Sequence, residues 1–380
     1  MDFKLTEEQQ MLQETALRLV RDEYEFEKRE TYRQSETGFS EGFWQQLSEL
    51  GLTAIPFAEE YGGIGGGGVE TQLMMTELGR GLCLEPYMQS VILGGGLITQ
   101  LGSDSQKEEL IPQIAAGELK LAVGLQEPQS HYNLADITTR AEKSGTGYRL
   151  SGRKAVVIGG HVADKLIVSA RAGGEAGDSQ GISLFLIDGD AAGLEKRVYP
   201  TNDGFKGCDL FLNGVEVPAS ALLGEEGNAY EGILYQSGRA IAALCAEAVG
   251  AMEETVALTL DYLKTRKQFG VPIGKFQVLQ HRMVDMGSEL EQARSMALVV
   301  ASVVDDAASP ARQRILSAAK NIIGRSGQYV AEQAIQLHGG IGMTWEYNLA
   351  HYAKRLIMIN HQLGDNDHHL EVFSELMDNA

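Results

Sequence analysis

Hydrophobic and polar residues follow a helical period in the first third of the chain. The segment Thr6-Glu7-Glu8-Gln9 forms a capping box, and apolar residues recur after it at steps of three or four, beginning with Leu12 and Ala16. Ser105-Gln106-Lys107-Glu108 repeats this start signal, and Gly117 gives a stop. We therefore expect roughly four or five helices before residue 119.

From Leu119 the period changes to two, and residues that favour strands become frequent. The runs are 120–125, 148–150, 154–158, 165–169, 182–187 and 209–215, separated by Gly, Asp and Ser clusters. They predict a compact β domain. The segment 172–181, rich in Gly and acidic residues, is expected to be an exposed hairpin loop.

Beyond Gly227 the helical period returns. Apolar residues recur at a mean step of about 3.5, typical of the seam of an antiparallel bundle. The seam residues are Phe276, Leu279, Met283, Met286, Leu290, Ala293 and Ala297. Ser309 and Pro310 are suited to begin a further helix, which ends at Gly339-Gly340. This order predicts a mainly α protein with a central β domain, divided into domains 1–118, 119–226 and 227–380.

Composition limits the partners that the chain could have. Its 52 acidic and 32 basic residues give a formal net charge of −20, which repels phosphate backbones and argues against nucleic acid or anionic membrane. The three cysteines, Cys83, Cys208 and Cys245, are scattered and suit a reducing compartment. No apolar run approaches the roughly 20 residues of a membrane span, and the first residues do not resemble a signal peptide. We expect a cytoplasmic protein.

The segment Gly63-Ile64-Gly65-Gly66-Gly67-Gly68 satisfies the GxGxxG pattern of dinucleotide-binding turns. A proline and two carboxylates precede it, and the pattern after it is that of one amphipathic helix. A nicotinamide site would need a buried strand before Tyr61. A flexible turn before a helix is the other interpretation.

Arg266-Lys267-Gln268-Phe269-Gly270 lies where one long helix is expected to end and the next to begin. Arginine pairs with phosphate through two donors, and phenylalanine offers a face to an adenine ring. The alternative is a structural helix terminus with a buried Phe269.

A second glycine motif, Gln336-Leu337-His338-Gly339-Gly340, closes the following helix. Double glycine is first of all a C-cap, although glycine also lets the backbone approach a ligand closely. His338 is open to two interpretations, a packed or capping residue and a catalytic one.

The run Asp365-Asn366-Asp367-His368-His369 resembles a set of metal ligands. Adjacent histidines point to different faces of a helix, however, and no further ligand cluster follows. We expect no metal site, and interpret Asp365 and Asp367 as charges at a helix N-terminus.

Together these segments resemble the acyl-CoA dehydrogenase family over essentially the whole chain. The resemblance is carried by Asp2-Phe3, Thr6–Gln9, Pro56 to Gly65, Glu127-Pro128, the Arg266 motif with Phe276-Gln277, Gln336 to Gly342 and Glu346-Tyr347. The finer pattern at 339–347, 351–355 and 364–370 is most similar to the small subunit of pimeloyl-CoA dehydrogenases.

The resemblance implies an N-terminal helical domain, a middle β-barrel-like domain and a C-terminal four-helix bundle. It also implies a tetramer of flavoprotein subunits in fatty acid metabolism, with FAD lying between the β domain of one subunit and the helices of its neighbour. The residues that match the motifs for the adenine and pyrophosphate end of FAD are Arg266, Gln268, Phe269, Gln336, Gly339 and Gly340. The implied partners are an acyl-CoA substrate and an electron-transferring flavoprotein.

On the flavin-ring side the chain departs from the family pattern. The family's Thr-Glu-Pro-x-x-Gly-Ser-Asp signature corresponds to 126–133, where only Glu127-Pro128 is kept and Tyr132 adds bulk. Its Trp-Ile-Thr strand corresponds to Val156-Val157-Ile158, which has no hydroxyl.

The catalytic carboxylate of the family is also replaced. Dehydrogenation of a thioester needs a base for the α-proton, and the family position for it holds Leu363. The alternative position, on the long helix, holds Ala240. Glu247 and Asp365 are the candidates for a relocated base. The family's substrate-contacting arginine falls at Ile241, with Arg239 close enough for a local slip to restore it.

We therefore expect a subunit of a heteromeric FAD-dependent acyl-CoA dehydrogenase, with a second family chain as partner. Two alternatives stay open. One is a self-sufficient enzyme, as a homo-oligomer with a relocated base. The other is a structural or CoA-binding homologue without flavin.

Overall fold

The computed structural model describes residues 4–378, so Asp2 and Phe3 lie outside the described residues. The described residues form two compact units. One comprises residues up to 31, 67–83 and those from 241 onward, and the other comprises 32–66 and 84–240. Helices α2 (Phe26–Gln34) and α7 (Tyr230–Thr265) contribute residues to both. The division into three domains, with boundaries after residues 118 and 226, stays a prediction.

The second unit begins with short helices and continues into the sheet. Its helical segments are α3 (Glu41–Glu49), the 3₁₀ turns η1 (Leu52–Ala54) and η2 (Glu59–Tyr61), the π-helical η3 (Met88–Gly95), α5 (Gly96–Leu101) and α6 (Asp104–Ala115). A further 3₁₀ turn, η4 (Ala219–Ala221), precedes the last strand. Helix α6 is capped by Ser103 with Gln106, so our prediction of a start at Ser105 was wrong by two residues.

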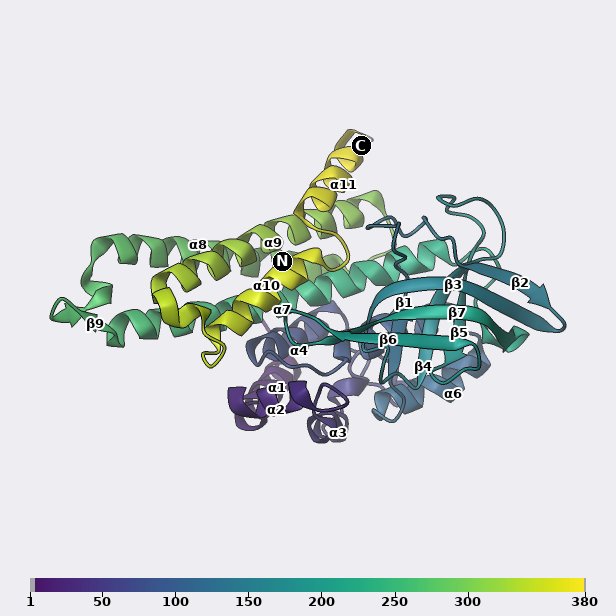
Figure 1. The fold of residues 1–380 in the computed structure, drawn as a ribbon, viewed down its shortest axis with the longest axis horizontal. Helices are drawn as coiled ribbons and strands as arrows, with labels where there is room; N and C mark the ends of the chain where they lie inside the picture. Colours follow the sequence, from purple (N-terminus) through teal and green to yellow (C-terminus); the bar gives the residue numbers. More distant parts are fainter. Residues whose placement is uncertain (1–3, 379–380) are drawn as a thin grey trace. The chain divides into compact units, whose positions relative to one another are not determined.

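One twisted sheet follows these helices in the same unit (Figure 1). Its strands are β1 (Leu121–Gly124), β2 (Arg140–Ser144), β3 (Gly147–Ile158), β4 (Lys165–Arg171), β5 (Ile182–Asp188), β6 (Leu194–Pro200), β7 (Lys206–Pro218) and β8 (Leu222–Leu223). The order is β6-β7-β3-β2-β4-β5-β8, with β1 pairing parallel to β4. Two of the predicted runs, 148–150 and 154–158, are parts of the single strand β3. The segment 172–181 joins antiparallel strands β4 and β5 and is largely exposed, as predicted.

The helical unit contains α1 (Glu7–Glu23), α4 (Gly68–Arg80), α8 (Gln277–Val303), α9 (Pro310–His338), α10 (Leu349–His361) and α11 (Asn366–Asp378). Helices α8, α9 and α10 lie side by side, and α11 packs on α9 (Figure 1). The capping box of Thr6 and the N-cap of Ser309 are both confirmed. The short elements at the ends of this bundle are β9 (Lys267–Gln268), β10 (Val271–Pro272), η5 (Ile273–Lys275) and η6 (Gly339–Met343).

Two glycines set the approach of α4 to α7. A Cβ on Gly79 would lie 2.1 Å from the carbonyl oxygen of Glu247, and one on Gly250 would lie 1.8 Å from that of Thr76. Both distances are far inside van der Waals contact, so only glycine allows the two backbones to pack this closely.

The predicted seam of α8 is buried only in its second half. Met286, Leu290, Ala293 and Ala297 are buried, whereas Phe276 is 38% exposed. Val278 and Val284 in the first half are more exposed still. The helical period was therefore right, but of the seven seam residues only these four are buried, and Leu279 and Met283 are partly buried.

The glycine run before α4 does not form a dinucleotide site. The segment before Tyr61 consists of 3₁₀ turns, so the strand that such a site requires is missing there. Glu70 and Asp305 accept from the backbone amides of Gly67 and Gly68 at 2.8 and 2.6 Å, which occupies the helix N-terminus with the chain's own carboxylates. The turn interpretation is right.

The predicted fold class is confirmed, with N-terminal helices, a middle β domain and C-terminal helices. No helix among residues 4–378 is long and apolar enough to cross a membrane.

Candidate functional site

The turn after α7 is strained and exposed. Strands β9 and β10 form a two-residue hairpin, whose central residues Phe269 and Gly270 have φ angles of +54° and +80°. Positive φ at both positions is the type I′ geometry, which normally takes Asn-Gly because a bulky side chain is unfavourable there. The ring of Phe269 is 89% exposed, so the alternative of a buried phenylalanine was wrong. The ring of Phe269 meets the ring of Phe276 edge-on, with ring centroids 6.1 Å apart.

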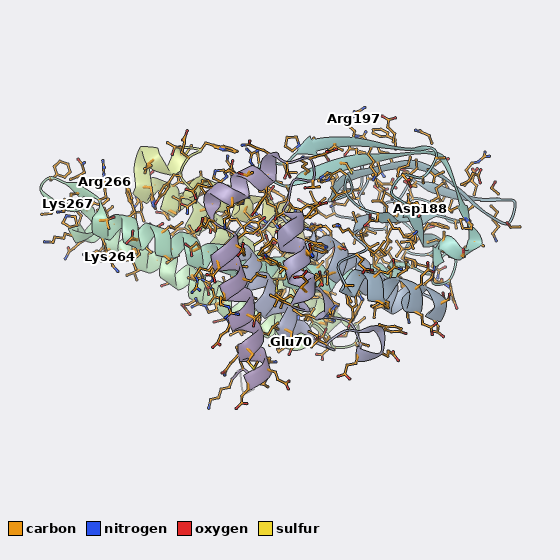
Figure 2. The ribbon with its side chains drawn as sticks, turned by 90° about the horizontal axis from the view of Figure 1, so that it is seen from below. Glu70, Asp188, Arg197, Lys264, Arg266 and Lys267 are labelled. Atoms are coloured by element: carbon orange, nitrogen blue, oxygen red, sulfur yellow. The ribbon has the colours of Figure 1, made fainter. Side chains whose placement is uncertain are left out.

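Arg266 and Gln268, on either side of Lys267, are also exposed. Their side chains make no hydrogen bond or ion pair to any residue that the structure describes. Figure 2 shows Lys264, Arg266 and Lys267 together at the end of the helical unit. This end is locally basic in a chain of net charge −20.

The second motif closes α9. Gln336 is exposed and makes no side-chain hydrogen bond to a described residue. Gly339 has a φ of +64° and caps the helix, as predicted, but Gly340 lies outside the left-handed region. A Cβ on either glycine would meet no atom within 4 Å. The chain's own conformation therefore does not explain glycine at 340, which leaves its backbone open to a group from outside.

His338 is a packed residue. Its ring is buried, its Nδ1 lies 2.9 Å from the Ala334 carbonyl oxygen, and it stacks on Tyr262 with ring centroids 4.3 Å apart. Burial lowers the pKa of His338, although the bond to Ala334 opposes this shift. The capping and packing interpretation fits this environment better than the catalytic one.

The turn that contains Leu363 is firmly held. Leu363 has a φ of +56° between α10 and α11, and its carbonyl oxygen lies 3.0 Å from Nε2 of His369. The Lys320 ammonium donates to the carbonyl oxygens of Asn360 and Gly364 at 3.0 and 2.7 Å. Burial lowers the pKa of Lys320 to about 8. The turn is thus built without a carboxylate at 363.

The two candidates for a relocated base both have structural contacts. Glu247 is buried, and its two oxygens accept from Nε and Nη2 of Arg355 at 2.5 and 2.7 Å. Asp365 accepts from the backbone amide of His368 at 3.0 Å, which is the predicted role at a helix N-terminus. Ala240 and Ile241 are buried, and Arg239 is half-buried. None of these positions presents an unpaired carboxylate.

Residues 126–139 fold around the buried carboxylate of Glu127. Its Oε1 accepts from the Lys154 ammonium at 2.7 Å and from the Thr139 amide at 3.0 Å. Its Oε2 accepts from the Thr138 amide at 2.8 Å, from the Thr138 hydroxyl at 2.5 Å and from Gln129 at 3.0 Å. Five donors therefore fix the side chain of Glu127. Glu127-Pro128 is the part of the family signature at 126–133 that the chain keeps.

Because of this network, the stability of the folded protein at acid pH depends on the ionised carboxylate of Glu127. Burial alone would raise its pKa, but Lys154 and the two threonines outweigh burial and lower the pKa to about 2. The stabilisation is therefore complete above about pH 4.5 and lost as pH falls toward 2, a difference of about 3 kcal/mol in the free energy of unfolding. We expect Glu127→Gln to flatten the pH dependence of chemical unfolding in this window. A slope equal to that of the parent protein would contradict this assignment.

The strand segment Val156-Val157-Ile158 is bulged. Val156 has a φ of +54° at a register shift between β3 and β7, and its side chain is 49% exposed. Asp209 accepts from the Val156 amide at 3.2 Å, from the Tyr199 hydroxyl at 3.0 Å and from Arg153 at 2.6 Å. The segment offers an exposed apolar side chain at its bulge and no side-chain donor.

Three site-related residues escaped the sequence analysis, namely Tyr262, Lys154 and Lys320, and Arg355 entered it only as part of the resemblance at 351–355. Lys154 and Lys320 stand in otherwise apolar surroundings, 0% and 1% exposed, and a buried lysine needs a partner. A charged residue inside an apolar run was the available signal, but it does not identify the partner.

No group of three or more His, Cys, Asp or Glu side chains that could hold a metal ion occurs within residues 4–378. His369 is buried, and burial lowers its pKa to about 3. Its two ring nitrogens lie at hydrogen-bond distance from Ser317 and from the Leu363 carbonyl oxygen.

Comparison with known proteins gives matches along the whole chain. The acyl-CoA dehydrogenase N-terminal, middle and C-terminal domains match residues 6–118, 122–215 and 236–375. The probable acyl-CoA dehydrogenase YngJ of Bacillus subtilis is 32% identical over 359 residues, 92% of each chain. Butyryl-CoA dehydrogenase from Megasphaera elsdenii has a TM-score of 0.89 at 26% identity, over 99% of this chain and 100% of its own.

A second similar structure is the ChsE4-ChsE5 complex from Mycobacterium tuberculosis. One chain of that complex matches with a TM-score of 0.90 at 25% identity, over 100% of this chain and 100% of its own. Because all three domain families match in order and a relative is 32% identical over 92% of the chain, this protein belongs to the acyl-CoA dehydrogenase family.

Proposed function

We propose that the chain is one subunit of a heteromeric FAD-dependent acyl-CoA dehydrogenase. Members of the family bind FAD and are typically tetramers. In this proposal the flavin is held mainly by a partner chain of the same family, and this chain contributes Arg266, Gln268, Phe269, Gln336, Gly339 and Gly340. The acyl group is a dicarboxylic chain of the pimeloyl kind, by resemblance, and an electron-transferring flavoprotein accepts the electrons.

The observation that carries the proposal is that these six residues are exposed, and that the side chains of Arg266, Gln268 and Gln336 have no hydrogen bond or ion pair to a described residue. Phe269 is held in a strained conformation in solvent, and strain of about 1–3 kcal/mol persists where it serves a function. Arg266 has no partner among the described residues. An FAD bound by a neighbouring chain would supply a phosphate for Arg266 and an adenine face for Phe269.

The residues fit the adenine and pyrophosphate end of FAD. The Arg266 guanidinium can donate to two phosphate oxygens, and no described atom lies within 4 Å of where a Cβ at Gly340 would be, so in this proposal the phosphate approaches the backbone there. When bound, FAD accepts the hydride from the substrate β-carbon. The chain supplies no unpaired carboxylate at 363, 240, 247 or 365 for the α-proton, so in this proposal the base belongs to the partner. Similarity to the ChsE4-ChsE5 complex supports a two-chain assembly.

The visible absorption spectrum of the purified protein tests the proposal. We expect a colourless chain when it is expressed alone, and a yellow complex when it is co-expressed with a second acyl-CoA dehydrogenase chain. Stoichiometric flavin and normal turnover in the lone chain would support the self-sufficient enzyme. Absence of flavin in every combination would support the structural or CoA-binding homologue.

Arg266→Gln is expected to weaken FAD binding to the assembly by about 10- to 100-fold, since a charge-assisted hydrogen bond to phosphate is lost. The exposed Lys264→Gln is the matched control, with an expected change of less than about twofold. Both are measured by titrating the flavin-depleted assembly with FAD. Equal affinities in the two variants would remove Arg266 from the site.

A further inference from the structure

The two predicted cofactor motifs are joined by a pair of stacked rings. Tyr262 lies one helical turn before Arg266, and its carbonyl oxygen accepts from the Arg266 amide at 2.9 Å. His338 is the last residue of α9 and directly precedes Gly339. The two rings stack at 4.3 Å with an interplanar angle of 23°. The stack therefore connects the end of α7 with the end of α9.

Further contacts orient the histidine. Because its Nδ1 faces the Ala334 carbonyl oxygen at 2.9 Å, that nitrogen carries the proton. Nε2 is then an acceptor and lies 3.4 Å from the Tyr347 hydroxyl, whose ring is tilted against that of His338 at 5.4 Å. The imidazole is thus fixed along two directions, and Tyr262 packs on its face.

The residues that the stack joins have few other constraints. Arg266, Gln336, Gly339 and Gly340 are exposed, and added Cβ atoms at the two glycines would meet no neighbour. Their relative placement is consequently set by the ends of α7 and α9, and the Tyr262–His338 stack joins these ends.

We infer that Tyr262 and His338 are positioning residues, which hold Arg266 and the Gly339-Gly340 backbone in register as one receptor for the pyrophosphate of FAD. This inference rests on the proposed function. In this inference neither Tyr262 nor His338 contacts FAD. The stack restricts the motion of the two helix ends before FAD binds. Less conformational entropy is then lost on binding, so FAD binds more tightly.

The contrasting possibility is that the stack only stabilises the end of the bundle. Leucine at 262 removes the ring, whereas phenylalanine keeps it and removes only the hydroxyl. A positioning role predicts that Tyr262→Leu weakens FAD binding by about five- to tenfold and that Tyr262→Phe stays within about twofold of the parent. His338→Leu should resemble Tyr262→Leu, and the double variant should be no weaker than either single one, because the stack is already lost.

The experiment titrates FAD into the flavin-depleted assembly containing each variant, with Arg266→Gln in parallel, and records thermal unfolding of each apo protein. Selective loss of FAD affinity in Tyr262→Leu, with rescue by phenylalanine and little change in apo unfolding, supports the inference. If Arg266→Gln weakens FAD binding and Tyr262→Leu does not, the inference fails and the proposed function stands. A common drop in unfolding temperature and affinity without rescue by phenylalanine also overturns it.

If neither Arg266→Gln nor Tyr262→Leu changes FAD affinity, or if no assembly binds FAD, the proposed function fails and the inference fails with it. Additive effects in the Tyr262→Leu/His338→Leu pair would show two independent contributions and would overturn the stack as the shared element.

Discussion

Replacing Glu247 with glutamine is expected to lower the free energy of unfolding by about 3–5 kcal/mol while turnover per folded, flavin-loaded assembly stays unchanged. The carboxylate is 5% exposed, and both of its oxygens are bound by Arg355. Removing its charge takes away the carboxylate that accepts from the buried Arg355 guanidinium through both oxygens. Chemical unfolding, monitored by circular dichroism, and turnover measured well below the unfolding midpoint separate the two effects.

The control is Glu291→Gln, which removes an exposed carboxylate that pairs with Arg294 on the same helix. Exposed pairs contribute at most about 1 kcal/mol, so this variant should differ little from the parent. The double variant Glu247→Leu/Arg355→Met should recover most of the stability, since it removes both charges together. A loss of turnover of 100-fold or more in Glu247→Gln, per folded enzyme, would make Glu247 the base and favour the self-sufficient enzyme.

Helix boundaries were predictable where a local signal decides them. The capping box at Thr6 and the Ser309-Pro310 pair depend on residues within one turn, and both are present. At α6 two serines fit the same pattern. Because α5 ends at Leu101, Ser103 is already extended and takes the cap, a choice that depends on the preceding helix and not on the local motif.

Besides the two-residue strands β8, β9 and β10, the prediction missed β2 and β6, which carry little hydrophobic signal. β2 has the sequence Arg-Ala-Glu-Lys-Ser, and β6 contains Glu195, Lys196 and Arg197. Their positions follow from pairing with β3 and β7, which are long and apolar. A strand that forms because it pairs with neighbouring strands, and not because of its own side-chain pattern, cannot be recognised from the periodicity of its hydrophobic residues.

The candidate site shows the same division between local and distant information. The motifs around Arg266 and Gly339 were recognised because their residue types and spacing can be read directly from the sequence, although each motif also had a structural interpretation. The exposure of Phe269 was not, since a lone aromatic residue is usually buried. Likewise, Glu247 is an unremarkable glutamate on α7 until Arg355, 108 positions away, is found beside it.

Lys154→Met is expected to lower the free energy of unfolding by about 3–5 kcal/mol, as much as Glu247→Gln. Lys154 and Glu127 are 0% and 3% exposed, and the lysine donates to Glu127 and to Ser169 at 2.7 and 2.9 Å. Loss of the ammonium leaves the carboxylate buried, with only neutral donors. The control is Lys165→Met, which breaks an exposed ion pair with Asp188 and should cost less than about 1 kcal/mol.

This prediction also concerns what the retained Glu127-Pro128 signifies. If Glu127 organises residues 126–139 through Lys154 and the threonines, its retention is explained by folding and carries no information about flavin. The folded fraction of Lys154→Met should then bring as much FAD into the assembly as the parent chain does, because in the proposed arrangement this β domain does not hold the ring. A Lys154→Met variant as stable as the parent would contradict the structural role of the pair. A folded variant that assembles normally but has lost its flavin would instead indicate that the loop around Glu127 lies against the cofactor.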